Sequence, residues 1–321
     1  MIQDGFILVD KPEGWTSFKT DRFVGRLLGT RKVGHLGTLD PFATGLLPVF
    51  VGKGLKFLRF CEGFDKGYSC RCIFGAETDT MDKTGEITSE NYPSADVLEQ
   101  LEKSDYELIR NAALKVKVTK EQLPPAYSAK KIDGVKAYEL ARKGEMPDLK
   151  PAPITIYSLD ITDIMKRDKG FAIDFDCMCS KGTYIRTICS DLGDITGFGA
   201  YAESLRRTVN GQFNVKDAFT PDELEKMAEA GDFSFVRDAA ETISFLPEIK
   251  LDPKQTKDIK FGRKIAFPIN VKIEGEERIY YRATSEDKLI AVVFPAVENG
   301  DLVMRIERFY AHDKSMQYLQ P

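Results

Sequence analysis

The chain has 321 residues, which predicts one large domain or a medium domain followed by a small one. Apolar residues make up 42% of it and charged residues 30%, a balance typical of a soluble globular protein with a substantial core. Six cysteines are too few for a disulfide scaffold in a chain of this length, and the first residues do not resemble a secretory signal. Because no apolar run is long enough for a transmembrane helix either, we expect a cytoplasmic protein without a membrane partner.

Charge is distributed unevenly along the chain. The net charge is −4, and an acidic protein is by itself a poor partner for nucleic acid. Residues 108–150, however, carry ten Lys and Arg against five Asp and Glu, a local excess of five positive charges. This basic segment is therefore a candidate surface for phosphate groups.

The first third of the chain predicts strands and a helix around a glycine-rich loop. An apolar strand over 6–9 is followed by a helix that we expect Ser17 to cap and that ends near Gly29. Residues 31–45 form the loop, and residues 46–51 form an apolar strand. A strand over 68–74 then leads to a turn at 79–84.

The middle of the chain mixes helices with antiparallel strands. Residues 96–109 and 133–143 have helical patterns, whereas 114–118 is predicted to be extended. The alternating runs 154–165 and 171–179 predict a hairpin, after which a short helix starts near Tyr184. This mixture indicates an α+β fold rather than a doubly wound parallel sheet.

A change of composition divides the chain near residue 245. Residues 217–245 are acidic and helical, and after them short strands separated by turns dominate. Their spacing is typical of a small β-barrel or sandwich. We therefore expect one domain over 1–245, with a basic insertion at about 120–150, and a second domain over 246–321.

Several common kinds of active site are missing from the sequence. Two histidines leave little scope for a His-rich metal site, and the two Cys-x-Cys pairs have the spacing of neighbours on one strand face, not of zinc ligands. No glycine loop for phosphate or dinucleotide binding is present, nor is a Gly-x-Ser-x-Gly motif. If the protein is an enzyme, its chemistry therefore rests on a carboxylate, and we expect no metal.

The densest candidate for such chemistry is the loop 34-GHLGTLDPFATG-45. Pro41 favours an extended conformation at Asp40, which presents the carboxylate from a loop. Three glycines let the backbone turn tightly and approach a ligand closely. An ordinary Asp-Pro turn explains the same residues about equally well.

This loop resembles the signature Gly-His-x-Gly-Thr-Leu-Asp-Pro of the bacterial tRNA pseudouridine-55 synthase family, the TruB family. Five further segments resemble motifs of that family in the same order, so the resemblance covers nearly the whole chain. The segments are 8-LVDKPEGWTS-17, 66-KGYSCRCIFGAETDTMDKTGEI-87, 124-PPAYSAKKIDGVKAYELAR-142, 179-CSKGTYIRTICSDLG-193 and 201-YAESLRRT-208.

The resemblance implies a fold and a reaction. The fold is the pseudouridine-synthase fold, with a mixed, largely antiparallel central sheet flanked by helices and loops, plus a small C-terminal PUA-like β-barrel. In the reaction, the bond from N1 of uridine 55 to the ribose breaks and the sugar rejoins the base at C5. Because this is an isomerisation, we expect no cofactor. The partner implied is the T stem-loop of tRNA, with no obligate protein partner.

The resemblance also implies the catalytic residues. Asp40 would be the nucleophile, which attacks the base at C6 or the ribose at C1′, or promotes a glycal by elimination. Arg186 would be its ion-pair partner and hold the pKa of the carboxyl down despite a dry pocket; a surface salt bridge is the alternative. Tyr68 would stack on the extruded uracil and its phenol would handle a proton; without the motif it is an ordinary strand aromatic.

Further residues are implied at the substrate. Tyr184 and Leu205 would line the pocket, although simple core packing explains them too. Lys11 would support loop structure or contact a phosphate. His35 would fill the space that the flipped bases vacate, and its alternative is a hydrogen-bonded loop histidine.

The basic insertion bears on the class of protein. Lys130 and Lys131 lie in it and are expected to grip the T arm through phosphates. We expect an enzyme; a tRNA-folding chaperone that mainly binds is a second hypothesis, and a guide-RNA-dependent synthase subunit is a third. The insertion 124–142 favours a stand-alone enzyme. The stretch 270–281 is more acidic than an RNA-binding surface should be, so we expect the C-terminal domain either to contact the acceptor end of the tRNA or to be largely structural.

Overall fold

The structure is a computed structural model that describes residues 4–128, 130–132, 135–137, 140, 148–268 and 278–310. The chain divides into two compact units, Met1–Arg237 and Asp238–Pro321. Within the second unit, the Asp238 carboxylate accepts a hydrogen bond from the Tyr310 hydroxyl at 2.5 Å. This division lies a few residues before the one expected near 245.

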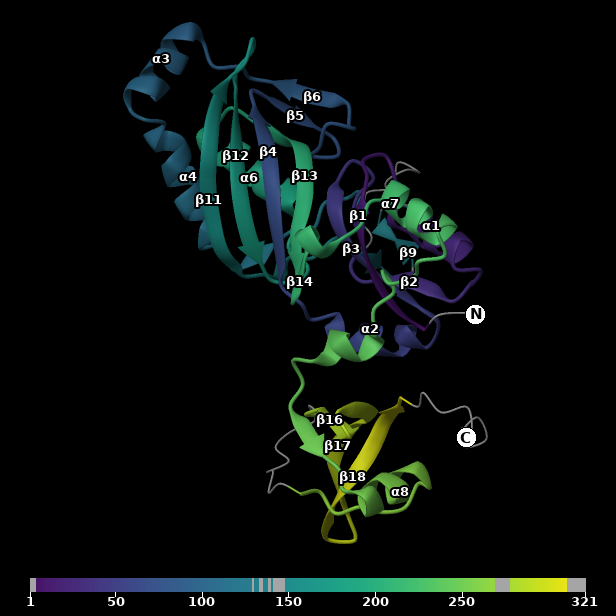
Figure 1. Ribbon diagram of the computed structural model, residues 1–321. Helices are drawn as coiled ribbons and strands as arrows, with labels where there is room; N and C mark the ends of the chain where they lie inside the picture. Colours follow the sequence, from purple (N-terminus) through teal and green to yellow (C-terminus); the bar gives the residue numbers. More distant parts are fainter. Residues whose placement is uncertain are drawn as a thin grey trace. The chain divides into compact units, whose positions relative to one another are not determined.

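The first unit is built on one mixed sheet (Figure 1). Its main strands follow one another in the order β1 (Gly5–Lys11), β3 (Thr44–Val51), β13 (Ala200–Asn210), β4 (Lys66–Phe74), β12 (Phe171–Cys179) and β11 (Ile156–Lys166). The short strands β2 (Val33–His35) and β14 (Phe213–Asn214) pair with β3 and β13. Only the β3–β13 pair is parallel among the described strands of this sheet, which confirms the expected α+β class and largely antiparallel sheet.

Helices cover the sheet in two places, each with its own apolar core. One core lies where α4 (Glu107–Lys117) and α6 (Ile185–Thr196) pack with β4, β11, β12 and β13, and α3 (Ala95–Lys103) packs at its edge. The other lies where α1 (Ser17–Leu27) and α7 (Pro221–Glu229) pack with β1 and β3. Small elements complete the unit: η1 (Gly52–Phe57), α2 (Leu58–Cys61), η2 (Val215–Asp217), and the paired strands β5 (Ala76–Thr78) with β6 (Ile87–Glu90), β7 (Glu121–Gln122) with β10 (Ala152–Pro153), and β8 (Lys131–Ile132) with β9 (Val135–Lys136).

Two local predictions were wrong, for physical reasons. Thr16, not Ser17, caps α1, since the Thr16 side chain accepts from the Lys19 amide and Ser17 is already helical. Residues 114–118 are not extended, because α4 continues to Lys117 with its buried face on residues 109, 112, 113 and 116, a helical spacing. The helix predicted over 133–143 lies largely outside the described residues, and 135–136 form β9.

The second unit holds a four-stranded sheet. The strands of this sheet follow one another in the order β15 (Glu248–Lys250), β16 (Tyr281–Ser285), β17 (Lys288–Glu298) and β18 (Asp301–Phe309). The unit also contains η3 (Ala239–Ile243), which precedes β15, and α8 (Pro253–Lys260), which follows it. An isolated bridge adds Ala266 beside Val303 of β18. Over the described residues the strands form an open sheet rather than a closed barrel.

Candidate active site

An open pocket of about 580 Å³ lies in the first unit, over the middle of the sheet. The loop before β3, the strands β4 and β13, and the start of α6 supply its walls. These elements bring together five of the predicted site residues, Asp40, Tyr68, Tyr184, Arg186 and Leu205, and Lys130 joins them from the segment just before β8. Residues far apart in the chain thus share one pocket, of a size that suits a small ligand or a single nucleotide.

The loop that carries Asp40 is held from both sides. The Ser17 hydroxyl, at the start of α1, donates to the Leu39 carbonyl at 3.0 Å and accepts from the Leu39 amide at 2.8 Å. On the other side, the Pro41 carbonyl accepts from the Gly14 amide at 2.8 Å. The carboxylate is therefore presented from a loop whose neighbouring backbone is fixed.

Lys11 adds to this support. Its side chain is fully buried, and its ammonium donates to the carbonyls of Trp15 at 2.6 Å, Pro12 at 3.1 Å and Pro41 at 3.4 Å. Burial lowers the pKa of Lys11 to about 8, although the negative charge of Asp40 raises it. Of the two roles expected for Lys11, this geometry favours loop support, because a fully buried ammonium is out of reach of a phosphate.

Arg186 is the buried centre of the site. Its side chain is 3% exposed, and its Nε lies 2.9 Å from Asp40 Oδ2. Its Nη1 lies 3.3 Å from Asp82 Oδ2 and donates to the Thr80 carbonyl at 2.7 Å, and its Nη2 donates to the Tyr127 carbonyl at 2.9 Å. This is no surface salt bridge: each nitrogen of the guanidinium has a partner, so its orientation is fixed.

The electrostatic balance at Asp40 differs from the one expected. Burial raises the pKa of Asp40 above its ordinary value of 3.8, and the Arg186 charge opposes this without reversing it. Asp82 contributes to the rise, because a second carboxylate on the same guanidinium disfavours the ionised form of the first. The prediction that the Arg186 charge would outweigh the dry pocket is therefore wrong: it gave burial too little weight, and it left out Asp82.

Asp82 is a site residue that the sequence reasoning missed. It is 3% exposed, and its Oδ1 accepts from the Thr84 amide at 2.9 Å and from the Thr80 hydroxyl at 3.0 Å. It lies in the turn predicted at 79–84, between β5 and β6. The sequence shows Asp82 as an Asp among threonines in that turn, and this pattern by itself indicates only an ordinary turn.

Tyr68 faces the pocket from β4. Its side chain is 8% exposed, and burial raises its pKa to about 12, although the neighbouring Arg207 charge lowers it. The phenol is therefore neutral near pH 7, where it donates a hydrogen bond more readily than it accepts a proton.

Tyr184 and Leu205 both line the pocket, and core packing also involves Leu205. Tyr184 precedes α6, and Gln122 fixes its backbone: the Gln122 amide donates to the Tyr184 carbonyl at 3.1 Å, and its oxygen accepts from the Tyr184 amide at 2.8 Å. Strand β7 therefore holds the start of the helix that carries Arg186.

Arg207 is a second residue of the pocket that the sequence reasoning missed. Residues 201–208 were recognised as a family motif, but no strand was predicted there, so nothing indicated that Arg207 lies in the middle of the sheet. Its side chain is fully buried and donates to the Leu46 carbonyl at 2.8 Å and the Gly37 carbonyl at 2.8 Å. Gly45, opposite it in β3, has φ +98°, and a Cβ there would lie 2.3 Å from the Arg207 carbonyl oxygen. This glycine thus serves the close β3–β13 pairing rather than the approach of a ligand.

His35 and the two lysines of the insertion lie less centrally. His35 is on β2, outside the lining of the pocket, with Nδ1 2.8 Å from Asp21 Oδ2 and Nε2 3.2 Å from the Thr38 hydroxyl. Lys130 lines the pocket and donates to the Lys150 carbonyl at 3.3 Å. The side chain of Lys131 lies outside the described residues.

The residue types that commonly bind metals are placed as follows in the described part of the chain. All six cysteines are buried and free. Among the residues that the structure describes, no three His, Cys, Asp or Glu side chains gather as a metal site would require. No described helix is both long and apolar enough to cross a membrane.

Comparison with solved structures defines the class of fold. The H/ACA ribonucleoprotein bound to a substrate RNA containing 2′-deoxyuridine includes a chain that matches with a TM-score of 0.65. The match covers 97% of this chain and 86% of that chain at 19% identity, so it concerns the fold alone. The fold is that of the pseudouridine synthases.

The family follows from sequence comparison. The model of the TruB family pseudouridylate synthase N-terminal domain matches residues 25–185, and that of the tRNA pseudouridylate synthase B C-terminal domain matches residues 186–239. The chain belongs to the TruB family. The tRNA pseudouridine synthase B of Syntrophotalea carbinolica is 37% identical over 81% of either chain. That of Solibacter usitatus is 36% identical over 94% of this chain and 100% of its own length.

Proposed function

We propose that the protein isomerises uridine 55 in the T loop of tRNA to pseudouridine, with Asp40 as the nucleophile. Relatives that are 36–37% identical over most of this chain are named tRNA pseudouridine synthase B, which supports tRNA as the substrate. The observation that carries the assignment of Asp40 is its 2.9 Å contact with the 3% exposed Arg186 at a pocket wall. A carboxylate held against a fixed charge in a pocket is positioned to act on a bound base or sugar.

The chemistry conserves all atoms. The Asp40 carboxylate attacks C6 or C1′, or promotes elimination, so that the N1–C1′ bond breaks. The freed base turns and forms the C5–C1′ bond, and any bond between Asp40 and the substrate breaks again, which regenerates the carboxylate. C5 then loses its proton and N1 gains one. Arg186 orients the carboxylate, and Tyr68 packs against the base as a neutral hydrogen-bond donor.

Access to the pocket requires that the uridine leave its stack in the T loop, which costs a few kcal/mol. We assign His35 to the space that the flipped nucleotides leave. Its imidazole is held by Asp21 and Thr38, at the border of the pocket, so it is fixed enough to fill that space. The lysines of the insertion would hold the T arm, and the second unit would act as a PUA-like RNA-binding domain.

Two alternatives make different predictions. A tRNA-folding chaperone would need RNA binding but not the carboxylate. A guide-RNA-dependent subunit would be inactive on tRNA alone, and the basic insertion favours the stand-alone enzyme over it. We infer a stand-alone enzyme that needs no metal or organic cofactor, so its activity should persist in EDTA on a T stem-loop that folds without metal.

The test compares Asp40→Ala and Asp40→Asn with Asp168→Asn, an exposed Asp in the β11–β12 turn, on unmodified tRNA. Both Asp40 variants should bind tRNA like the wild type and form no pseudouridine, whereas Asp168→Asn should be fully active. Turnover of Asp40→Ala within tenfold of wild type, a barrier change of only about 1.4 kcal/mol, contradicts the assignment. Activity of the wild type only with an added guide RNA would favour the third hypothesis.

A further inference from the structure

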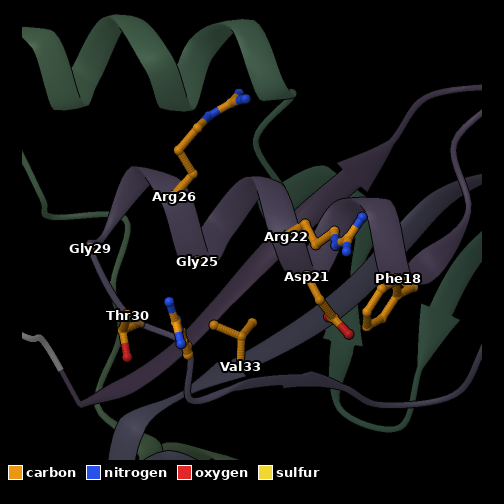
Figure 2. A pocket seen from close by; sticks show the side chains of 9 residues that line it. Phe18, Asp21, Arg22, Gly25, Arg26, Gly29, Thr30 and Val33 are labelled. Atoms are coloured by element: carbon orange, nitrogen blue, oxygen red, sulfur yellow. The ribbon is translucent and has the colours of Figure 1, made fainter.

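A second cavity of the first unit lies along α1 and the segment that joins it to β2. We call it the α1 groove; it has a volume of about 550 Å³ and is lined by Phe18, Asp21, Arg22, Arg26, Arg31 and Val33, among others (Figure 2). Residues 18–33 carry five Lys and Arg and one acid, Asp21, on a protein whose net charge is −4. Positive charge is therefore concentrated at this groove, outside the basic insertion.

Two of the arginines are free to bind an anion. Arg22 and Arg31 are exposed, and neither has an acidic partner within 4.0 Å in the described part of the chain. Arg26 is less available, because it lies 3.4 Å from Glu225 of α7 and points toward that helix in Figure 2. Asp21, the one acid here, is engaged by His35 at 2.8 Å.

An exposed aromatic ring accompanies these charges. Phe18 is 62% exposed, and the Arg22 guanidinium lies 5.0 Å from the centre of its ring. Figure 2 shows Phe18, Asp21 and Arg22 together at one end of the helix. Cations beside a free aromatic face are the usual means of binding single-stranded RNA, since phosphates meet the cations and a base stacks on the ring.

The side chain of His35 links the α1 groove to the catalytic pocket. The His35 imidazole contacts Asp21, which lines the α1 groove, and Thr38, which lines the catalytic pocket two residues before Asp40. A strand of RNA with one nucleotide in the catalytic pocket therefore has its neighbouring nucleotides within reach of the α1 groove.

We propose that the α1 groove is a second nucleotide subsite, which binds the RNA segment adjoining the target uridine. Arg22 and Arg31 bind the backbone phosphates of this segment, and Phe18 stacks on one of its bases. This inference rests on the proposed function, because it assumes that an RNA uridine occupies the Asp40 pocket. It assigns to α1 a share of substrate binding that is separate from the grip of the basic insertion.

The test neutralises single phosphates of the RNA. A T stem-loop is synthesised with one methylphosphonate linkage at a time through the loop, and its Kd is measured with Asp40→Asn protein, so that the RNA is not converted. One or two linkages beside the target uridine should raise the Kd about 3- to 10-fold. In Arg22→Ala/Arg31→Ala protein, in the same Asp40→Asn background, neutralising these linkages should have no further effect. An abasic nucleotide at the stacked position should similarly have no further effect in Phe18→Ala protein.

The charge-matched control is Lys103→Ala/Lys166→Ala, which removes two exposed lysines that already pair with glutamates on α3. It should keep the wild-type response at every linkage. If each neutralised linkage raises the Kd equally in the control and in the arginine variant, the α1 groove does not bind the RNA. Such a result with a wild type that converts uridine 55 overturns the subsite alone, whereas a wild type that forms no pseudouridine in tRNA overturns the proposed function.

Discussion

Replacing Arg186 by Met should expose how strongly the site depends on one buried charge. The change removes four contacts: the ion pairs with Asp40 and Asp82 and the hydrogen bonds to the carbonyls of Thr80 and Tyr127. Asp82 would remain as a buried carboxylate without a cation. Breaking a buried pair on one side costs about 3–5 kcal/mol, so the free energy of unfolding of the first unit should fall by about that amount.

A second substitution turns this estimate into a test of mechanism. In the wild type, Asp82→Asn loses one charge-assisted bond, which should cost about 1–3 kcal/mol. In the Arg186→Met background, the same change removes the uncompensated buried charge, so it should be neutral or stabilising. The two substitutions should therefore couple by at least about 1–3 kcal/mol.

Urea unfolding followed by tryptophan fluorescence measures these effects. Trp15 is the only tryptophan, and its ring packs 5.4 Å from Phe23 in the α1 core, so its signal reports on the first unit. Equal destabilisation by Asp82→Asn in both backgrounds would refute the shared role of Arg186. Arg186→Met should also lack activity under conditions where it remains folded.

Three further outcomes are expected. Only the ionised Asp40 carboxylate reacts, and burial raises its pKa, so the single-turnover rate should fall as the pH drops through a pKa above 3.8. Asp82→Asn should move this fall in rate to lower pH, because Asp82 also raises the pKa of Asp40; an unchanged pH profile would contradict the interaction between the two carboxylates. His35→Gln should keep substantial activity and His35→Ala should lose more, with rescue of His35→Ala on a stem-loop already opened at the target; equal defects on intact and opened loops would place His35 in the chemistry. Lys130→Ala/Lys131→Ala should raise KM and flatten the salt dependence of binding, and an unchanged salt slope would make the insertion an ordinary solvated surface.

Local patterns were enough to predict much of the fold. Alternating apolar residues marked the hairpin of β11 and β12, and a polar turn between them fixed their antiparallel pairing. Strand β13 was not predicted because two arginines interrupt its pattern. The buried Arg207 donates hydrogen bonds to carbonyls of β3 and of the Asp40 loop, partners that the sequence does not show. Similarly, the helical pattern over 96–109 is divided between α3 and α4, and α4 runs on to Lys117 because tertiary packing buries its apolar face.

The sequence by itself determined the chemistry available to this protein: ordered motifs place Asp40 before a proline in a glycine-rich loop, and Tyr68 and Arg186 in recognisable segments. Such motifs are local, so they can be read without knowing what lies opposite them. Only the tertiary structure decided which charges meet. Asp82 joins Arg186 from a turn about a hundred residues earlier in the chain, and burial, not the ion pair, sets the direction of the Asp40 pKa. Desolvation and long-range pairing depend on the packed surroundings of a group, and a one-dimensional pattern carries no measure of either.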